Sequence, residues 1–215
     1  MAYTRQDLER IQSAIAKGEM EVQYADRRVR YRSIDELRAA QREAPVRGEV
    51  TMARIDIAAA GGKNRVAFLD MIAVSEIGSA LLAKSDDGYN VLVGSTAGRP
   101  LLFASYAEHP NVLNRQIPVP STAAGRYQIL NRWWRIYQAQ MKLPDFGPVS
   151  QDRYALQQLR EHGALPLIDA GRFREAVAKV SNVWASLPGA GYGQHENRIE
   201  HLLAAYRAAG GEVVT

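Results

Sequence analysis

The sequence predicts an α+β fold that is mostly helical and contains a small β-sheet, for three reasons. Apolar residues recur every three or four positions in several segments, as they do in amphipathic helices. Two short segments, 89–94 and 100–103, are instead typical of strands. A stretch with several Gly and Ala residues at 45–64 divides the chain into a small unit at 1–44 and a larger unit at 65–215.

The composition excludes several classes of protein. The 215 residues are 47% hydrophobic and 23% charged, which is ordinary for a globular protein. The formal charge of +4 suits an anionic partner such as cell-wall polymer or nucleic acid, without identifying one. Because there is no cysteine, disulfides, thiolate metal sites and Cys nucleophiles are excluded. We expect neither a signal peptide nor a transmembrane segment, since the N-terminus is highly charged and no apolar run is long enough.

The small unit is predicted to be a helix, a hairpin and a second helix. The first helix covers 4–18 and the second covers 33–43, each beginning with a candidate capping box. Between them, alternation on both sides of 26–27 predicts a hairpin whose inner face consists of Val22, Tyr24, Val29 and Tyr31. Its outer face carries an arginine row that either contacts nucleic acid or protein or is simply solvated, namely Arg28, Arg30 and Arg32.

This unit resembles the gpW-type head–tail joining proteins of tailed phages. The matching stretches are Tyr3-Thr-Arg-Gln-Asp-Leu, Asp26-Arg-Arg-Val-Arg-Tyr and Ser33-Ile-Asp-Glu-Leu. The basic tail end of that family is not recognisable here. The resemblance implies a part in closing the filled phage head and attaching the tail.

Residues 45–64 are predicted to be a linker, because Pro45, Gly48 and the Gly61–Gly62 pair break regular structure. Met52 lies within this stretch and is a candidate internal start. The chain is then either a natural fusion or an upstream reading frame joined to a complete downstream one.

The segment after the linker is predicted to be a helix that presents a single glutamate. Spacings of three, four and three place four side chains on one helical face: Val66, Leu69, Ala73 and Glu76. Because the other three are apolar, we expect Glu76 to be poorly solvated. Poor solvation raises the pKa of a carboxyl group and suits it to act as a general acid. The alternative is a glutamate at the end of a helix that turns out to solvent.

The rest of the larger unit is expected to be helical around two irregular loops. Helical periodicity predicts four further helices, over 129–137, 150–163, 172–184 and 199–206. The Pro-rich stretch 111–120 cannot be the interior of a helix. The Gly-rich stretch 187–194 allows backbone torsions that other residues avoid.

The larger unit closely resembles the lambda-type phage endolysins over roughly 150 residues. The matching stretches are collinear and include Ala67-Phe-Leu-Asp-Met-Ile-Ala, Ser75-Glu76, Asp87-Gly-Tyr-Asn-Val-Leu-Val-Gly94, Ala124-Gly-Arg-Tyr-Gln128, Arg132-Trp-Trp134 and Ser181-Asn-Val-Trp-Ala-Ser-Leu-Pro-Gly-Ala-Gly-Tyr-Gly-Gln194. The resemblance implies a lysozyme-like fold and a lytic transglycosylase without a cofactor. Such an enzyme cuts the β-1,4 bond between N-acetylmuramic acid and N-acetylglucosamine in peptidoglycan glycan strands and leaves a 1,6-anhydro product. The family's single catalytic glutamate falls on Glu76.

The same resemblance implies four substrate-binding residues. Tyr127 and Gln128 are implied to lie near the cleft, where they hold sugar or position the acid. The alternative for Tyr127 is a ring that fills the core between helices. Tyr192 and Gln194 lie in the Gly-rich loop, which matches one mobile lip of the family's cleft, and the stretch 113–120 matches the other. The alternative for Tyr192 is an aromatic ring packed on the surface.

One carboxyl group is enough for this chemistry, whereas ordinary glycosidases use two. An inverting or retaining hydrolase would need a second acid, and Asp86 or Asp87 is the candidate. Asp70 lies six residues before Glu76 and therefore on another face. The family often continues Gly-Thr after Ser-Glu, where this chain has Ile77–Gly78, so the adjoining loop is expected to differ.

Other chemistry-bearing side chains are expected to be structural. The tryptophans lie in helical patterns and are predicted to be core rather than sugar platforms: Trp133, Trp134 and Trp184. The four histidines share no ligand spacing, so we expect no metal site. Several arginines are expected on solvated helix faces, where they could also attract the anionic peptide stems of the wall: Arg153, Arg160, Arg172 and Arg174.

We therefore expect a monomeric phage or prophage endolysin that lyses the host from within. It would remain in the host cytoplasm until a holin opens the inner membrane and would then act on the wall. We expect no nucleic-acid partner for the enzyme unit. One alternative is a virion head–tail joining protein that carries a lytic domain. Another is that residues 1–44 dock the enzyme on a phage or wall partner.

Overall fold

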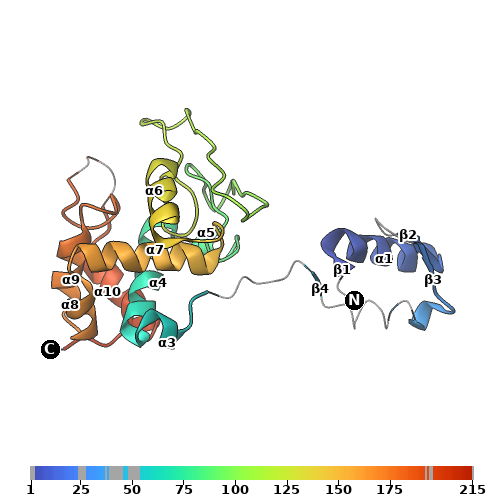
Figure 1. Ribbon diagram of the computed structural model, residues 1–215, viewed down its shortest axis with the longest axis horizontal. Helices are drawn as coiled ribbons and strands as arrows, with labels where there is room; N and C mark the ends of the chain where they lie inside the picture. Colours follow the sequence, from blue (N-terminus) through green and yellow to red (C-terminus); the bar gives the residue numbers. More distant parts are fainter. Residues whose placement is uncertain are drawn as a thin grey trace. The chain divides into compact units, whose positions relative to one another are not determined.

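The computed structural model describes residues 3–23, 28–36, 38, 46–47, 54–191, 193 and 196–214. The chain divides into two compact units, Met1–Met52 and Ala53–Thr215 (Figure 1). Each unit has a hydrophobic core of its own. In the part of the chain that is described, no helix combines the length and the apolar composition needed to cross a bilayer.

The smaller unit packs one helix against a hairpin. Helix α1 (Arg5–Lys17) precedes strands β2 (Glu21–Gln23) and β3 (Arg28–Arg30), which pair antiparallel with Val22 opposite Val29. The core between them consists of Ile11, Ala14, Val22 and Tyr31. The hairpin is therefore where the alternation predicts it, with Arg28, Arg30 and Arg32 exposed on the outside.

Parts of this unit differ from the prediction or lie outside the described residues. The short strands β1 (Tyr3–Thr4) and β4 (Val46–Arg47) pair parallel, which the sequence did not indicate. Residues 34–36 and 38 are helical, but the remainder of the predicted helix over 33–43 is largely outside the described residues. The predicted inner-face residue Tyr24 is outside them as well.

The larger unit is helical around one central helix. Its described helices are α3 (Ile57–Ala60), α4 (Lys63–Ile77), α5 (Ser79–Leu82), α6 (Asn131–Met141), α7 (Pro148–Glu161), α8 (Leu165–Asp169), α9 (Phe173–Val180) and α10 (Ile199–Ala208). The predicted long helices correspond to α4, α6, α7, α9 and α10. Helices α3, α5 and α8 were not predicted, because four or five residues are too few to show a helical period.

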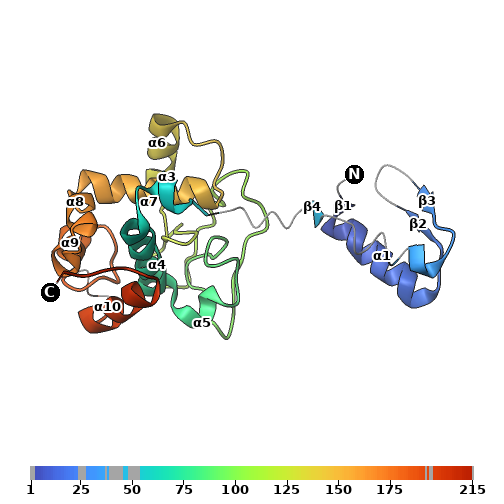
Figure 2. The same cartoon turned by 90° about the horizontal axis from the view of Figure 1, so that it is seen from below.

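Helix α4 is the element around which the others pack. It contacts α3, α5, α7, α8 and α10 (Figure 2). Its buried side chains cover most of the helix circumference rather than one stripe, at Ala67, Phe68, Leu69, Met71, Ile72, Ala73 and Ser75. The remaining face, with Val66, Asp70 and Val74, is half-buried. A helix with so wide an apolar surface belongs in the interior of a domain. Its last turn, which carries Glu76, is therefore fixed by the packing of most of the unit.

The strands predicted over 89–94 and 100–103 form only isolated β-bridges in the described residues. Val91 pairs with Leu102 and Leu92 with Ala124, and no longer ladder follows in the described residues. Glycines with positive φ, at Gly88 and Gly94, turn the chain on both sides of this pairing. The Pro-rich stretch is not helical, as predicted.

The structure corrects the boundary of the predicted linker over 45–64. Residues 54–64 belong to the larger unit, and Ile55 is 5% exposed in its core. The backbone N–H of Ile55 donates to the buried Asp152 carboxylate at 2.8 Å, and Arg54 lies 2.8 Å from Asp70. Gly61 and Gly62 were assigned to a linker because glycines break regular structure. In the structure Gly61 ends α3 and Gly62 precedes the first residue of α4.

This boundary predicts the outcome of two truncations. A variant that begins at Met52 should unfold at the same temperature as the larger unit within the full chain, because it keeps Arg54 and Ile55. A variant that begins at residue 65 should lose at least about 2–5 kcal/mol, the usual cost of deleting one large buried aliphatic side chain. Calorimetry of both variants measures the difference. Equal stability of the two would contradict the boundary at residue 53.

Candidate active site

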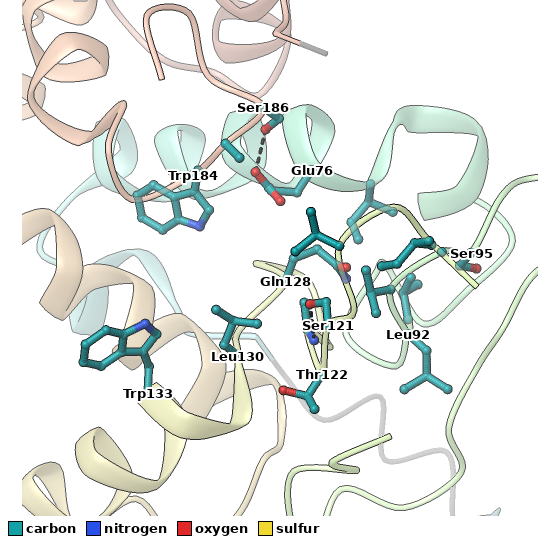
Figure 3. Close-up of a pocket in the computed structure, with 18 of the residues that line it drawn as sticks. Glu76, Leu92, Ser95, Ser121, Thr122, Gln128, Leu130, Trp133, Trp184 and Ser186 are labelled. Carbon is teal, nitrogen blue, oxygen red and sulfur yellow. Dashed lines mark hydrogen bonds between the residues drawn. The ribbon is translucent and has the colours of Figure 1, made fainter. Parts of the chain in front are cut away.

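The larger unit contains a cleft of about 870 Å³ that begins at the end of α4. Residues from five stretches of the chain line it: 75–77 with Leu81, 91–95, Leu113 with Ile117 and 119–123, Gln128 with Leu130, Arg132 and Trp133, and 182–186. Figure 3 shows the side chains that point into it from these separate stretches. Of the described lining residues, Glu76 has the only carboxyl group and Arg132 the only basic side chain.

Glu76 projects into this cleft from the last turn of α4. The Ser186 hydroxyl donates a hydrogen bond to its Oε1 atom at 2.5 Å, while the other oxygen is directed into the cleft (Figure 3). Burial raises the pKa of Glu76, and hydrogen bonding to Ser186 opposes that increase to a smaller extent. A carboxyl group with a raised pKa holds a proton that it can deliver. The prediction of a poorly solvated glutamate therefore agrees with the structure.

A hydrogen-bonded cluster holds Ser186 against α4. The Ser75 and Ser186 hydroxyls lie 2.7 Å apart. The Asn197 amide donates to the Ser75 carbonyl at 3.1 Å and to the Ser186 carbonyl at 3.3 Å. The same amide donates to the Ser75 hydroxyl oxygen at 3.1 Å, and the backbone N–H of Asn197 donates to the Ser186 carbonyl at 2.8 Å. Ser75 and Asn197 thus hold Ser186, the hydrogen-bond donor to Glu76. Because these three residues meet only in the folded chain, the sequence did not predict a role for Ser186 or Asn197.

Gln128 reaches the cleft because of a tight turn. Gly125 has φ of 77°, and a Cβ there would lie 2.2 Å from the Gln151 side-chain oxygen. That oxygen accepts the Arg126 N–H at 2.9 Å, so the turn is fixed from behind by a buried amide. Gln128 itself lies in the left-handed region at φ of 47° and lines the cleft. The placement of Gln128 near the cleft agrees with the prediction.

Tyr127 does not line the cleft, which corrects its prediction as a substrate-binding residue. Its side chain is 1% exposed, and its hydroxyl donates to the buried Asp152 carboxylate at 2.6 Å. Tyr89 donates to the same oxygen at 2.9 Å. Adjacent residues in an irregular turn point in different directions, so the ring of Tyr127 enters the core while Gln128 faces the cleft. The alternative interpretation of Tyr127 as a core residue is the one that the structure supports.

The predicted residues Tyr192 and Gln194 lie outside the described residues. The structure describes the residues on both sides of them, up to 191 and from 196. Glu196 accepts the backbone N–H groups of Gly189 and Gly191, each at 2.8 Å. The opposite lip is positioned by Asn114, which exchanges two backbone hydrogen bonds with Ser121 and donates from its side chain to the Val93 carbonyl at 2.9 Å.

Asp86 and Asp87, the two acids considered for the alternative hydrolase, bond to residues outside the cleft, and so does Asp70. Asp87 pairs with Arg126 at 2.6 Å, and Asp70 pairs with the same guanidinium at 2.7 Å. Asp86 accepts the Tyr106 hydroxyl at 2.5 Å. None of the three lines the cleft. In the part of the chain that is described, no cluster of His, Cys, Asp or Glu could hold a metal ion.

The three tryptophans have different environments. Trp134 is 1% exposed in the core, as predicted. Trp184 is 4% exposed, lines the cleft and donates to the Tyr127 carbonyl at 3.2 Å. Trp133 was predicted to be core, but it is 46% exposed and lines the cleft. On α6 the buried residue is Trp134, and the sequence pattern does not decide which of the two adjacent tryptophans faces inward.

Comparison with known proteins gives a consistent family assignment. The family profile described as Endolysin matches residues 66–213. The endolysin of Escherichia phage lambda is 50% identical over 151 residues, which cover 69% of this chain and 92% of that protein. The endolysin of Escherichia phage P2 is 47% identical over 155 residues, which cover 69% of this chain and 94% of that protein.

A solved structure agrees with these relatives. Bacteriophage lambda lysozyme in complex with a chitohexasaccharide is 47% identical, with a TM-score of 0.66, and the match covers 76% of this chain and 100% of that one. These findings confirm the predicted endolysin resemblance and the lysozyme-like α+β fold. The resemblance of residues 1–44 to gpW-type proteins stays a prediction.

The contact between Ser186 and Glu76 makes a testable prediction about titration. Substituting Ser186→Ala removes a donor that stabilises the carboxylate, so burial is less opposed and the pKa of Glu76 should rise further. Carbon-13 NMR of labelled glutamate carboxyl groups follows this titration directly. Ser181→Ala is the control, since that hydroxyl donates to the Ala178 carbonyl on α9 and does not bond to Glu76. An unchanged or lowered pKa of Glu76 in Ser186→Ala would exclude the role given to Ser186.

Proposed function

Because the chain belongs to the endolysin family, whose members cleave peptidoglycan in host lysis, we propose that its cleft is the active site of a lytic transglycosylase. The bond cut is the β-1,4 linkage between N-acetylmuramic acid and N-acetylglucosamine. The product is a 1,6-anhydro-muramic acid end rather than a reducing end. The solved relative holds a chitohexasaccharide, which supports a glycan strand as the occupant of this cleft.

The observation that carries this proposal is the lone carboxyl group of the described cleft. Hydrolysis with inversion or retention uses two carboxyl groups on opposite sides of the scissile bond, because water or a covalent intermediate must be activated. Here Asp87 pairs with Arg126 and Asp70 with both Arg126 and Arg54, and none of the nearby aspartates lines the cleft. An acceptor hydroxyl supplied by the substrate removes the need for a second acid.

Glu76 would act first as an acid and then as a base. Protonated Glu76 donates its proton to the glycosidic oxygen, the bond from that oxygen to C1 breaks, and the N-acetylglucosamine side leaves as an alcohol. The C6 hydroxyl oxygen of the same muramic acid then bonds to C1, and its proton passes to the Glu76 carboxylate. The residue ends protonated and ready for another turn. Because the attacking hydroxyl belongs to the substrate, no second molecule has to be oriented.

The surrounding residues would support these two states. Ser186 donates to the carboxylate that exists between the two proton transfers, and so stabilises it without removing the raised pKa. Gln128 offers an amide on the wall of the cleft that suits a sugar hydroxyl or an N-acetyl group. Tyr192 and Gln194 are proposed, from the family resemblance alone, to contact the strand from the Gly-rich lip.

The setting proposed is lysis from within the host. The enzyme accumulates in the host cytoplasm as a monomer and reaches the wall when a holin opens the inner membrane. The separate core of residues 1–52 favours one further role, a module that docks on a phage structural protein or on the wall. Sedimentation of the full chain with phage particles, which a variant beginning at Met52 should not show, would test that role.

The transglycosylase itself is tested by digestion of purified peptidoglycan. We expect the full chain to release muropeptides with 1,6-anhydro ends, which mass spectrometry distinguishes from hydrated ends by the mass of one water. Glu76→Gln should lower the rate by about 10²–10⁴-fold, the usual contribution of a positioned acid–base group. Glu175→Gln, which alters an exposed glutamate paired with Arg172 on α9, should digest at the wild-type rate.

Two outcomes would contradict the proposal. Reducing ends in the wild-type digest would mean that water is the acceptor, and loss of activity in Asp86→Asn or Asp87→Asn would then identify the second acid. Full activity of a folded Glu76→Gln protein would exclude Glu76 as the proton donor.

A further inference from the structure

The cleft has a second chemical feature besides Glu76, on the first turn of α6. Trp133 lines the cleft with 46% of its surface exposed, which is unusual for so large an apolar side chain. Arg132 also lines the cleft, and its guanidinium lies 5.5 Å from the centre of the Trp133 ring. The indole and the guanidinium thus form one composite surface at the rim (Figure 3 shows Trp133).

In the part of the chain that the structure describes, Arg132 has no acidic partner, and it is the one arginine that lines the cleft. Arg126 pairs with Asp70 and Asp87. Arg172 pairs with Glu175, and Arg174 lies 3.6 Å from Glu200, so two of the arginines that could attract wall peptides have acidic neighbours. Arg153 and Arg160 border a different hollow of about 210 Å³. Arg132 is the cation that the cleft itself presents.

The inference rests on the proposed function, since it concerns the strand that Glu76 cuts. We propose that Arg132 and Trp133 form a rim subsite that recognises a sugar together with its attached peptide stem. The pyranose ring packs on the exposed surface of the indole, and the guanidinium binds a free carboxylate of the stem. The site therefore makes the enzyme prefer stem-bearing glycan over bare glycan.

Three properties of the pair fit this substrate. A planar guanidinium matches the two oxygens of a carboxylate, which a lysine ammonium does not. The contact of Arg132 with the indole face restricts the long side chain, so less conformational freedom is lost when the carboxylate binds. The indole surface that remains exposed gives a sugar an apolar platform beside that charge. No carboxylate of the described cleft other than Glu76 competes for the guanidinium.

The experiment compares two substrates with the same glycan backbone. One is peptidoglycan strand with intact peptide stems, and the other is the same strand after an amidase has removed the stems. Arg132→Gln should lower kcat/KM about 3- to 5-fold on stem-bearing strands, as expected for one partly exposed ion pair, and leave the bare strands unchanged. Trp133→Ala should lower kcat/KM on both substrates, since both present the sugar ring.

Arg135→Gln is the matched control, because Arg135 is exposed on the same helix and does not line the cleft. It should leave both rates unchanged, and the melting temperature of each variant verifies that it is folded. An Arg132→Gln variant that loses equal activity on both substrates, or none on either, would overturn the stem assignment. Mass spectrometry of the glycan ends in the same digests tests the transglycosylase reaction separately. Failure of the proposed reaction can therefore be distinguished from failure of the proposed stem recognition.

Discussion

The larger unit depends on one constraint, which is the burial of α4 around most of its circumference. A helix with so wide an apolar surface is stable only where other elements cover it, and α3, α5, α7, α8 and α10 pack against it. The helix ends at Ile77, and Gly78 follows it with φ of 81°, which turns the chain away. Its last turn therefore meets the cleft at a fixed position. The low solvation that raises the pKa of Glu76 results from the burial that holds the helix in place.

The same covering elements explain why distant stretches of sequence meet at the site. Asp152 on α7 accepts hydrogen bonds from Tyr89, Tyr127 and the Ile55 backbone, and so ties the start of the unit to the turn that carries Gln128. Gln151, the neighbouring residue, bonds the Tyr89 and Phe146 carbonyls and the Arg126 N–H. Two adjacent polar residues of one helix thus hold the turn that brings Gln128 to the cleft, although neither lines the cleft.

The sequence predicted what depends on regular periodicity. The long helices and the semi-apolar stripe that ends in Glu76 follow from spacings of three and four residues, and α4 has the predicted position. Irregular segments were harder, because no period tells which of two neighbours faces inward. Tyr127 was assigned to the cleft and lies in the core, whereas Trp133 was assigned to the core and lies in the cleft. No local sequence pattern marks Ser186 and Asn197 as site residues, because their role depends on tertiary contacts with Ser75 and Glu76.

Burial of Glu76 also couples protonation to folding. A carboxyl group whose pKa is higher in the folded state than in the unfolded chain binds its proton more tightly when folded. The favourable contribution is complete below the unfolded pKa, and it is lost as the pH rises through the folded pKa. At neutral pH the native state therefore gives up part of its stability to keep an ionisable group in a dry position. The cluster of Ser75, Ser186 and Asn197 offsets a portion of that loss, because Ser186 donates to the carboxylate. The cluster therefore contributes to the stability of the fold as well as to the position of the acid.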